Sequence, residues 1–150
     1  MDFPARKTLP HEVPSWVAGG ADYFITICTQ TRSENQLCKP GVAGMIRDGF
    51  SAYQKTGKWY VHLLLLMPDH LHAIISFSRE PGIQKSISAW KQYMARQAGI
   101  KWQRDFFEHR LRSGEGFREK ALYVRQNPVR AGLVSSAEEW LYVWDIKDFR

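Results

Sequence analysis

The sequence predicts an α+β fold built on an antiparallel sheet. Runs of β-branched and aromatic residues alternate with segments in which apolar residues recur at helical spacing, and two of the runs are separated by only two residues. So short a connection joins antiparallel neighbours, because parallel strands need a long crossover. The chain has 150 residues, 44% of them hydrophobic, which suits one domain with a substantial core.

The predicted elements follow one another with short connections. Strand composition and helical periodicity give strand 23–29, helix 40–55, strands 59–67 and 70–77, helix 83–98, strand 102–112 and helix 115–126. Asn127 ends the last helix because a residue before proline avoids helical torsion angles. This order matches the ferredoxin-like split βαβ arrangement, with helices on one side of the sheet and an appended C-terminal helix that carries Tyr123.

Composition narrows the classes of partner. Lys and Arg number 21 against 15 Asp and Glu, and the net charge of +6 favours a polyanion such as nucleic acid. No apolar run reaches the roughly 18 residues of a membrane span, and the first residues lack a signal-type apolar core. We therefore expect a cytoplasmic protein with no membrane partner. The cysteines Cys28 and Cys38 match neither a disulfide framework nor a zinc pattern.

His70 and His72 form a His-hydrophobe-His motif at the start of the predicted strand 70–77. Side chains alternate along a strand, so both imidazoles point to one face while Leu71 points into the core. Two imidazoles on one rigid strand can bind one divalent metal. The alternative is two polar side chains on the open face of a sheet, without a ligand.

Tyr123 and Asn127 lie one helical turn apart at the end of the predicted helix 115–126, on one face. A tyrosine hydroxyl there is a candidate nucleophile. Two simpler interpretations remain open: a tyrosine at the rim of the core, and an asparagine that only terminates a helix.

Several segments together resemble a known family. These are the His motif with the preceding 67–69, the segment 102–112 with Trp102, His109 and Arg112, and the segment 123–133 around Tyr123. They resemble the single-tyrosine transposases with a His-hydrophobe-His motif, most closely the REP-associated tyrosine transposases. The resemblance suggests a single catalytic domain, 1–150, with a family-like core at 20–133 and extensions at 1–19 and 134–150. In the first extension, Arg6, Lys7 and His11 match no motif that we can place.

The resemblance implies a metal-dependent endonuclease and strand transferase acting on single-stranded or hairpin DNA. Carried over by position, it makes His70 and His72 ligands of Mg²⁺ or Mn²⁺, Asn127 the third ligand with Gln126 as the competing amide, and Tyr123 the nucleophile that forms a 5′-phosphotyrosine. No nucleotide cofactor is expected, since the chain has no Walker-type motif. The resemblance is compatible with a monomer or a homodimer.

Basic residues in the second half of the sequence could line a phosphate groove. The predicted DNA-binding residues are Lys85, Lys91, Arg104, Arg110, Arg112 and Arg125. The alternative for each of these residues is a solvated side chain on a helix surface that contacts no DNA. Another function compatible with the composition is a non-catalytic module that binds single-stranded nucleic acid through exposed aromatic residues. A two-histidine phosphodiesterase needs a second histidine motif, which His11, His62 and His109 do not supply.

Overall fold

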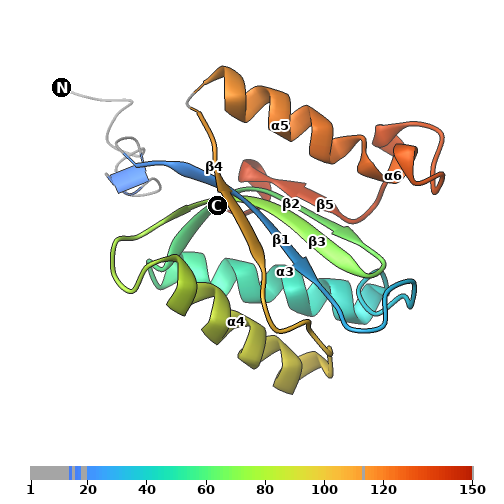
Figure 1. Ribbon diagram of the computed structural model, residues 1–150, viewed down its shortest axis with the longest axis horizontal. Helices are drawn as coiled ribbons and strands as arrows, with labels where there is room; N and C mark the ends of the chain where they lie inside the picture. Colours follow the sequence, from blue (N-terminus) through green and yellow to red (C-terminus); the bar gives the residue numbers. More distant parts are fainter. Residues whose placement is uncertain (1–13, 15, 18–19, 113, 150) are drawn as a thin grey trace.

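A five-stranded antiparallel sheet lies at the centre of the computed structural model, which describes residues 14, 16–17, 20–112 and 114–149 (Figure 1). The strands are β1 (Asp22–Cys28), β2 (Trp59–Met67), β3 (His70–Phe77), β4 (Phe107–Arg110) and β5 (Val143–Asp145), in the spatial order β4-β1-β3-β2-β5. The helices are α3 (Pro40–Lys55), α4 (Ile83–Ala98), α5 (Glu115–Arg125) and α6 (Asn127–Arg130), with 3-10 turns η2 (Ala137–Glu139) and η3 (Ile146–Phe149). Within the described residues, no helix is both long and apolar enough to cross a bilayer.

The predicted α+β class is confirmed, and the order of the first four strands, β4-β1-β3-β2, is that of a ferredoxin-like sheet. The bounds of α3, α4, β2 and β3 agree with the predicted ranges. Local signals explain the agreement for the helices. Pro40 suits the first turn of α3, and Gly99 adopts a left-handed conformation, with a φ of 70°, that ends α4.

Each face of the sheet has its own hydrophobic cluster, because side chains alternate along the strands. On one face, Ile25 and Leu71 pack beneath α3 and α4 (Figure 1). On the opposite face, Phe24 and Ile74 of the sheet form a cluster with Val124 of α5. The prediction of helices on one side therefore holds for α3 and α4, whereas the tyrosine-bearing helix α5 covers the other side.

The predicted strand 102–112 is shorter than expected. Trp102 forms only an isolated bridge with Thr29, and the regular strand β4 begins at Phe107. Between these two points, the Lys91 ammonium donates hydrogen bonds to three backbone carbonyls, those of residues 103, 104 and 105. The backbone of residues 103–105 thus curves around Lys91, and the regular ladder with β1 resumes only at Phe107.

The C-terminal segment adds a strand that the sequence did not predict. β5 pairs antiparallel with β2, and Leu64 lies opposite Trp144. Trp140 packs against the cluster beneath α5 and donates a hydrogen bond from Nε1 to the Leu66 carbonyl at 3.0 Å. A strand of three residues is too short for a recognisable alternation, so the sequence pattern did not reveal it.

Candidate active site

The two histidines lie on one face of β3, as predicted. Their ring centroids are 4.8 Å apart, and Leu71 between them is fully buried in the cluster on the opposite face. The face that carries the histidines is the one that α5 covers, and both side chains are partly buried. The expectation of an open face is therefore wrong, whereas the alternative of two histidines without a ligand stays open.

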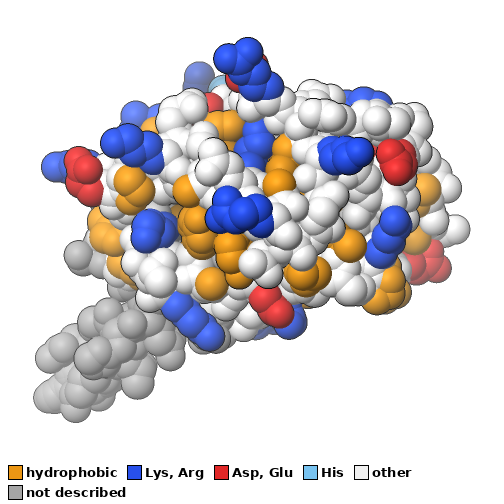
Figure 2. All heavy atoms as spheres, turned by 90° about the horizontal axis from the view of Figure 1, so that it is seen from below, with side chains coloured by type: hydrophobic (Ala, Val, Ile, Leu, Met, Phe, Trp, Pro, Cys, Tyr) orange, Lys and Arg blue, Asp and Glu red, His pale blue; other side chains and the backbone are white. Residues whose placement is uncertain are grey.

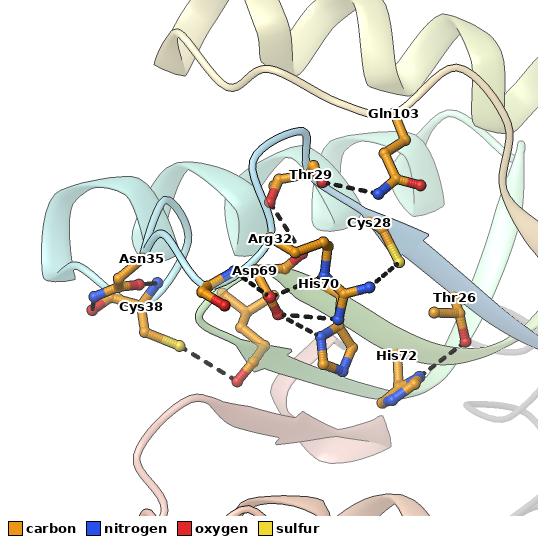
Figure 3. A network of polar contacts seen from close by, with 12 residues as sticks. Thr26, Cys28, Thr29, Arg32, Asn35, Cys38, Asp69, His70, His72 and Gln103 are labelled. Carbon is orange, nitrogen blue, oxygen red and sulfur yellow. Dashed lines mark hydrogen bonds and ion pairs between the residues drawn. The ribbon is translucent and has the colours of Figure 1, made fainter.

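A hydrogen bond at Nδ1 orients each imidazole (Figure 3). His70 Nδ1 lies 2.8 Å from Asp69 Oδ1, and His72 Nδ1 lies 2.9 Å from Thr26 Oγ1. An ionised carboxylate can only accept, so His70 donates from Nδ1 and keeps a lone pair on Nε2. The threonine hydroxyl can accept the Nδ1 proton of His72 in the same way. Outer partners of this kind are typical of metal-binding histidines, because they fix the tautomer and the ring orientation.

Asp69 is held in turn by the loop that follows β1 (Figure 3). Arg32 Nε and the Ser33 backbone N–H each lie 2.8 Å from Asp69 Oδ2. Burial acts to raise the pKa of Asp69, but the hydrogen bonds from Arg32, His70 and Ser33 outweigh it and hold that pKa well below its usual range. Ser33 reaches this position with a φ of 83°, a left-handed conformation that is uncommon outside glycine. Asp69 is therefore an anion at neutral pH.

Burial lowers the pKa of His72 to about 3, with smaller contributions from His70, Lys120 and Arg130 nearby. The imidazole is therefore neutral at physiological pH, and neutral imidazole is the form that binds a metal. In the described part of the chain, no group of three or more His, Cys, Asp or Glu side chains could hold a metal ion. The histidine pair would thus supply two nitrogen ligands and leave the other positions to amide, water or phosphate oxygens.

Tyr123 lies on α5 with 53% of its surface exposed, between two cations. Lys120 Nζ is 4.9 Å from the centroid of the phenol ring, and the guanidinium carbon of Arg130 is 4.0 Å from it. Arg130 is anchored there, since its Nη2 donates to the Tyr123 carbonyl at 2.8 Å. The exposed phenol therefore lies in a cationic environment, which suits the approach of a phosphate.

The sequence predicted that Asn127 ends the helix that carries Tyr123, but in the structure Asn127 begins a separate short helix. α5 ends at Arg125, and Asn127 is the first residue of α6, after Gln126 in a helical conformation. Asn127 Oδ1 accepts a hydrogen bond from Arg130 Nη2 at 2.9 Å. A carboxamide oxygen has a second lone pair, so this contact is compatible with a ligand. The choice between Asn127 and Gln126 as third ligand stays a prediction.

Phe24 connects the histidine pair with the tyrosine. Its ring stacks on His72 with 5.2 Å between centroids, and Lys120 Nζ lies 4.6 Å from the same ring. Lys120 therefore lies between Phe24 and Tyr123. A hollow beside it is lined in part by Tyr123, His109 and Arg112. The hollow is accessible from solvent and carries cationic side chains, as a phosphate-binding site requires.

The six predicted DNA-binding residues do not form one track. Arg112 lines the hollow beside Tyr123. Lys85 lies on α4, on the far side of the sheet, where Figure 2 shows Lys and Arg side chains scattered over the surface. Arg104 lines a different hollow, next to α4, and Arg110 lines one with Ile83 on that same side. Arg125 forms an ion pair with Asp145, 3.5 Å away.

Lys91 is not a phosphate ligand in this structure. Only 8% of its surface is exposed, and Nζ donates to the carbonyls of Gln103, Arg104 and Asp105 at 2.8, 2.9 and 3.4 Å. An ammonium has three N–H donors, so all of them are used. The predicted DNA-binding role of Lys91 is therefore wrong, and the residue instead anchors the loop between α4 and β4.

Two residues of the site escaped the sequence analysis. Thr26 orients His72 from β1, and Arg32 holds Asp69 from the loop after β1. The alternation in β1 could have assigned Thr26 to one face. Its partner could not be found in this way, because the pairing of Thr26 with His72 depends on the register between β1 and β3.

The described residues thus form a ferredoxin-like sheet whose central strand presents a His-hydrophobe-His pair on the face covered by α5, and α5 carries an exposed tyrosine. No protein-family model matches the chain. A Haemophilus influenzae protein, provisionally named a REP-associated tyrosine transposase, is 27% identical over 82% of this chain and 78% of its own length. The REP-associated tyrosine transposase of Escherichia coli is 25% identical over 81% of this chain and 74% of its own length.

Solved structures show the same fold. A REP-associated tyrosine transposase bound to a REP hairpin superposes with a TM-score of 0.73 and 22% identity, covering 83% of this chain and 76% of the other. A Deinococcus radiodurans protein, provisionally described as a transposase, gives a TM-score of 0.52 at 19% identity, with coverage of 71% and 88%. The chain is therefore similar to proteins named REP-associated tyrosine transposases, and the resemblance found in the sequence is confirmed.

Proposed function

We propose that this protein is a metal-dependent endonuclease and strand transferase that cleaves single-stranded DNA next to a hairpin, with Tyr123 as nucleophile. One observation carries the proposal. His70 and His72 each have Nδ1 in a hydrogen bond to an oxygen, which leaves both Nε2 atoms free on the face that α5 covers. The relatives named as REP-associated tyrosine transposases support the same chemistry, and one of them is bound to a REP hairpin.

The nucleophile needs help because a free tyrosine has a pKa of about 10. Lys120 and Arg130 flank the phenol ring and stabilise negative charge on Oη. In the proposed reaction, Oη attacks the phosphorus, a P–Oη bond forms and the bond from phosphorus to O3′ breaks. The phenol loses one proton and the departing 3′ hydroxyl gains one, so the step needs no external energy source.

The two histidines are suitable ligands for a divalent metal ion, since neutral imidazole nitrogens with a fixed orientation are common metal ligands. His70 and His72 would hold the ion, with an oxygen from Asn127 or Gln126. A bound Mg²⁺ or Mn²⁺ supplies Lewis-acid polarisation of the scissile phosphate. Asp69 and Thr26 keep the two rings in place, and Arg112 in the hollow beside Tyr123 can bind a neighbouring phosphate.

The test is a covalent adduct. Hairpin oligonucleotides with single-stranded tails, labelled at either end, are incubated with the protein and Mn²⁺ and separated under denaturing conditions. We expect the strand with the 5′ phosphate to migrate with the protein. Tyr123→Phe should lose the adduct while keeping its DNA affinity, because only the hydroxyl is removed.

Tyr93→Phe is the matched control. Tyr93 is also an exposed tyrosine, but it lies on α4, behind the sheet, so the adduct should persist. An adduct that survives in Tyr123→Phe would mean that another residue is the nucleophile. DNA binding without any adduct in the parent protein would favour the alternative of a non-catalytic binding module.

A further inference from the structure

Phe107 is a large aromatic side chain exposed next to the proposed active site. It begins the edge strand β4, and 55% of its surface is open to solvent. An exposed aromatic ring of this size offers a flat apolar face on which a nucleobase can stack. On its inner side Phe107 contacts Phe24, with ring centroids 6.2 Å apart and planes at 69°.

The register of the sheet places Phe107 in line with the histidine pair. Phe107 lies opposite Thr26 of β1, and Thr26 lies opposite His72 of β3. Two strand spacings separate Phe107 from His72, which corresponds to about 10 Å. Since Thr26 also forms the hydrogen bond to His72, all three side chains lie on the face of the sheet that α5 covers.

Two cations, Lys120 and Arg112, line the hollow near Phe107 together with one carboxylate, Glu119. The neighbouring Phe24 ring has Lys120 Nζ at 4.6 Å, and the hollow that Lys120 lines also contains Arg112 and His109. An exposed ring beside cations is complementary to a nucleotide of an unpaired strand, which presents a flat base and a phosphate together. Phe24 cannot take this role, because it is only 7% exposed.

We propose that Phe107 is a stacking platform for one unpaired nucleobase close to the scissile phosphate. This inference rests on the proposed function and deepens it, since it assigns the residue that positions the single-stranded part of the substrate. A base stacked on Phe107 holds the strand at the edge of the sheet, with its phosphates directed toward Lys120 and Arg112. Stacking tolerates any base, so the site adds affinity for unpaired DNA rather than sequence selectivity.

The experiment measures equilibrium binding in the Tyr123→Phe background, so that cleavage does not interfere. The probes are a hairpin with a single-stranded tail and a series of the same hairpin with one abasic site moved along the tail. Phe107→Ala should weaken binding of the intact hairpin about 5- to 150-fold, the range of one lost base stack. Phe107→Tyr should bind like the parent, because it keeps the ring.

The abasic series decides the interpretation. At one tail position, removal of the base should weaken the parent and should weaken Phe107→Ala no further, because the same contact is already lost. Leu141→Ala, which truncates an 80% exposed side chain, should bind all probes like the parent. Unchanged binding by Phe107→Ala, or an equal loss at every abasic position, would overturn the proposal.

The proposed function and the stacking site are tested by different measurements, so each can fail without the other. The adduct test on the protein with Tyr123 intact reports on nucleophilic cleavage, whereas the abasic series reports on stacking alone. Phe107→Ala with Tyr123 restored should still form the adduct at saturating DNA. If it binds as tightly as the parent and forms the adduct, the stacking site is refuted and the proposed function stands.

Discussion

The Thr26 hydroxyl orients His72 from the neighbouring strand. Its Oγ1 lies 2.9 Å from His72 Nδ1, and the two residues are paired in the register of β1 and β3. Asp69 does the same for His70, with the added charge of a carboxylate held by Arg32. The hydrogen bond from His70 to the ionised Asp69 is charge-assisted and therefore stronger than the one between His72 and the neutral Thr26 hydroxyl.

Thr26→Val should weaken metal binding. Valine keeps the shape and removes the hydroxyl, so the Nδ1 proton of His72 loses its acceptor and the ring is free to reorient. We expect the Mn²⁺ dissociation constant, measured by titration calorimetry or electron paramagnetic resonance, to rise about 10- to 100-fold. Thr56→Val is the control. It removes a hydroxyl at the end of α3, where Oγ1 donates to the Tyr53 carbonyl, and should leave the Mn²⁺ dissociation constant unchanged. Equal Mn²⁺ affinity of both variants would contradict the role of Thr26.

At the scale of elements, α3 and α4 pack closely at a glycine. A Cβ at Gly49 would lie 2.9 Å from both Met94 Sδ and Trp90 Nε1. Trp90 is fully buried and a rigid ring cannot move aside, so the close approach depends on the missing side chain. Helical periodicity located both helices, but it does not show which glycine lies at their contact.

Gly49→Ala should therefore destabilise the protein by about 1–3 kcal/mol, the usual cost of overpacking a core. Gly44, also within α3, has no atom within 4 Å of the position a Cβ would take. Gly44→Ala should stabilise by about 0.5–1 kcal/mol, because alanine loses less backbone freedom on folding. Urea unfolding of both variants measures the two free energies. Stabilisation by both substitutions would show that α3 and α4 are not in close contact at Gly49.

At the scale of the whole molecule, positive charge is spread over both sides of the sheet. The net charge is +6, yet the predicted DNA-binding residues lie in several separate places. General attraction to a polyanion follows from the total charge, whereas the phosphates next to Tyr123 can be contacted only by residues of that side.

Arg112→Gln and Lys85→Gln remove the same charge from opposite sides of the molecule. Arg112→Gln should weaken hairpin binding and lower the slope of log affinity against log salt by about 1, the signature of one lost phosphate contact. Lys85→Gln should leave the slope nearly unchanged. Fluorescence anisotropy at several salt concentrations measures both. If Lys85→Gln has the larger effect, the DNA lies over α4 and not in the hollow beside Tyr123.

The local sequence by itself determined the order of the elements from β1 to α5, the bounds of α3 and α4, the β2–β3 hairpin and the opposite directions of His70 and Leu71. These features depend on periodicity and on turn residues, so neighbours along the chain are sufficient to specify them. The resemblance to the transposases also came from short local motifs, which the comparisons confirmed.

Only the tertiary structure decided which side of the sheet α5 covers, that Thr26 and Arg32 support the histidine pair, and that Lys91 is buried in a loop anchor. It also added β5 to the sheet edge. Each of these features joins residues far apart in the sequence, through strand register or through a side chain that reaches a distant carbonyl. Such contacts depend on how loops close and cores pack, and no local pattern encodes them.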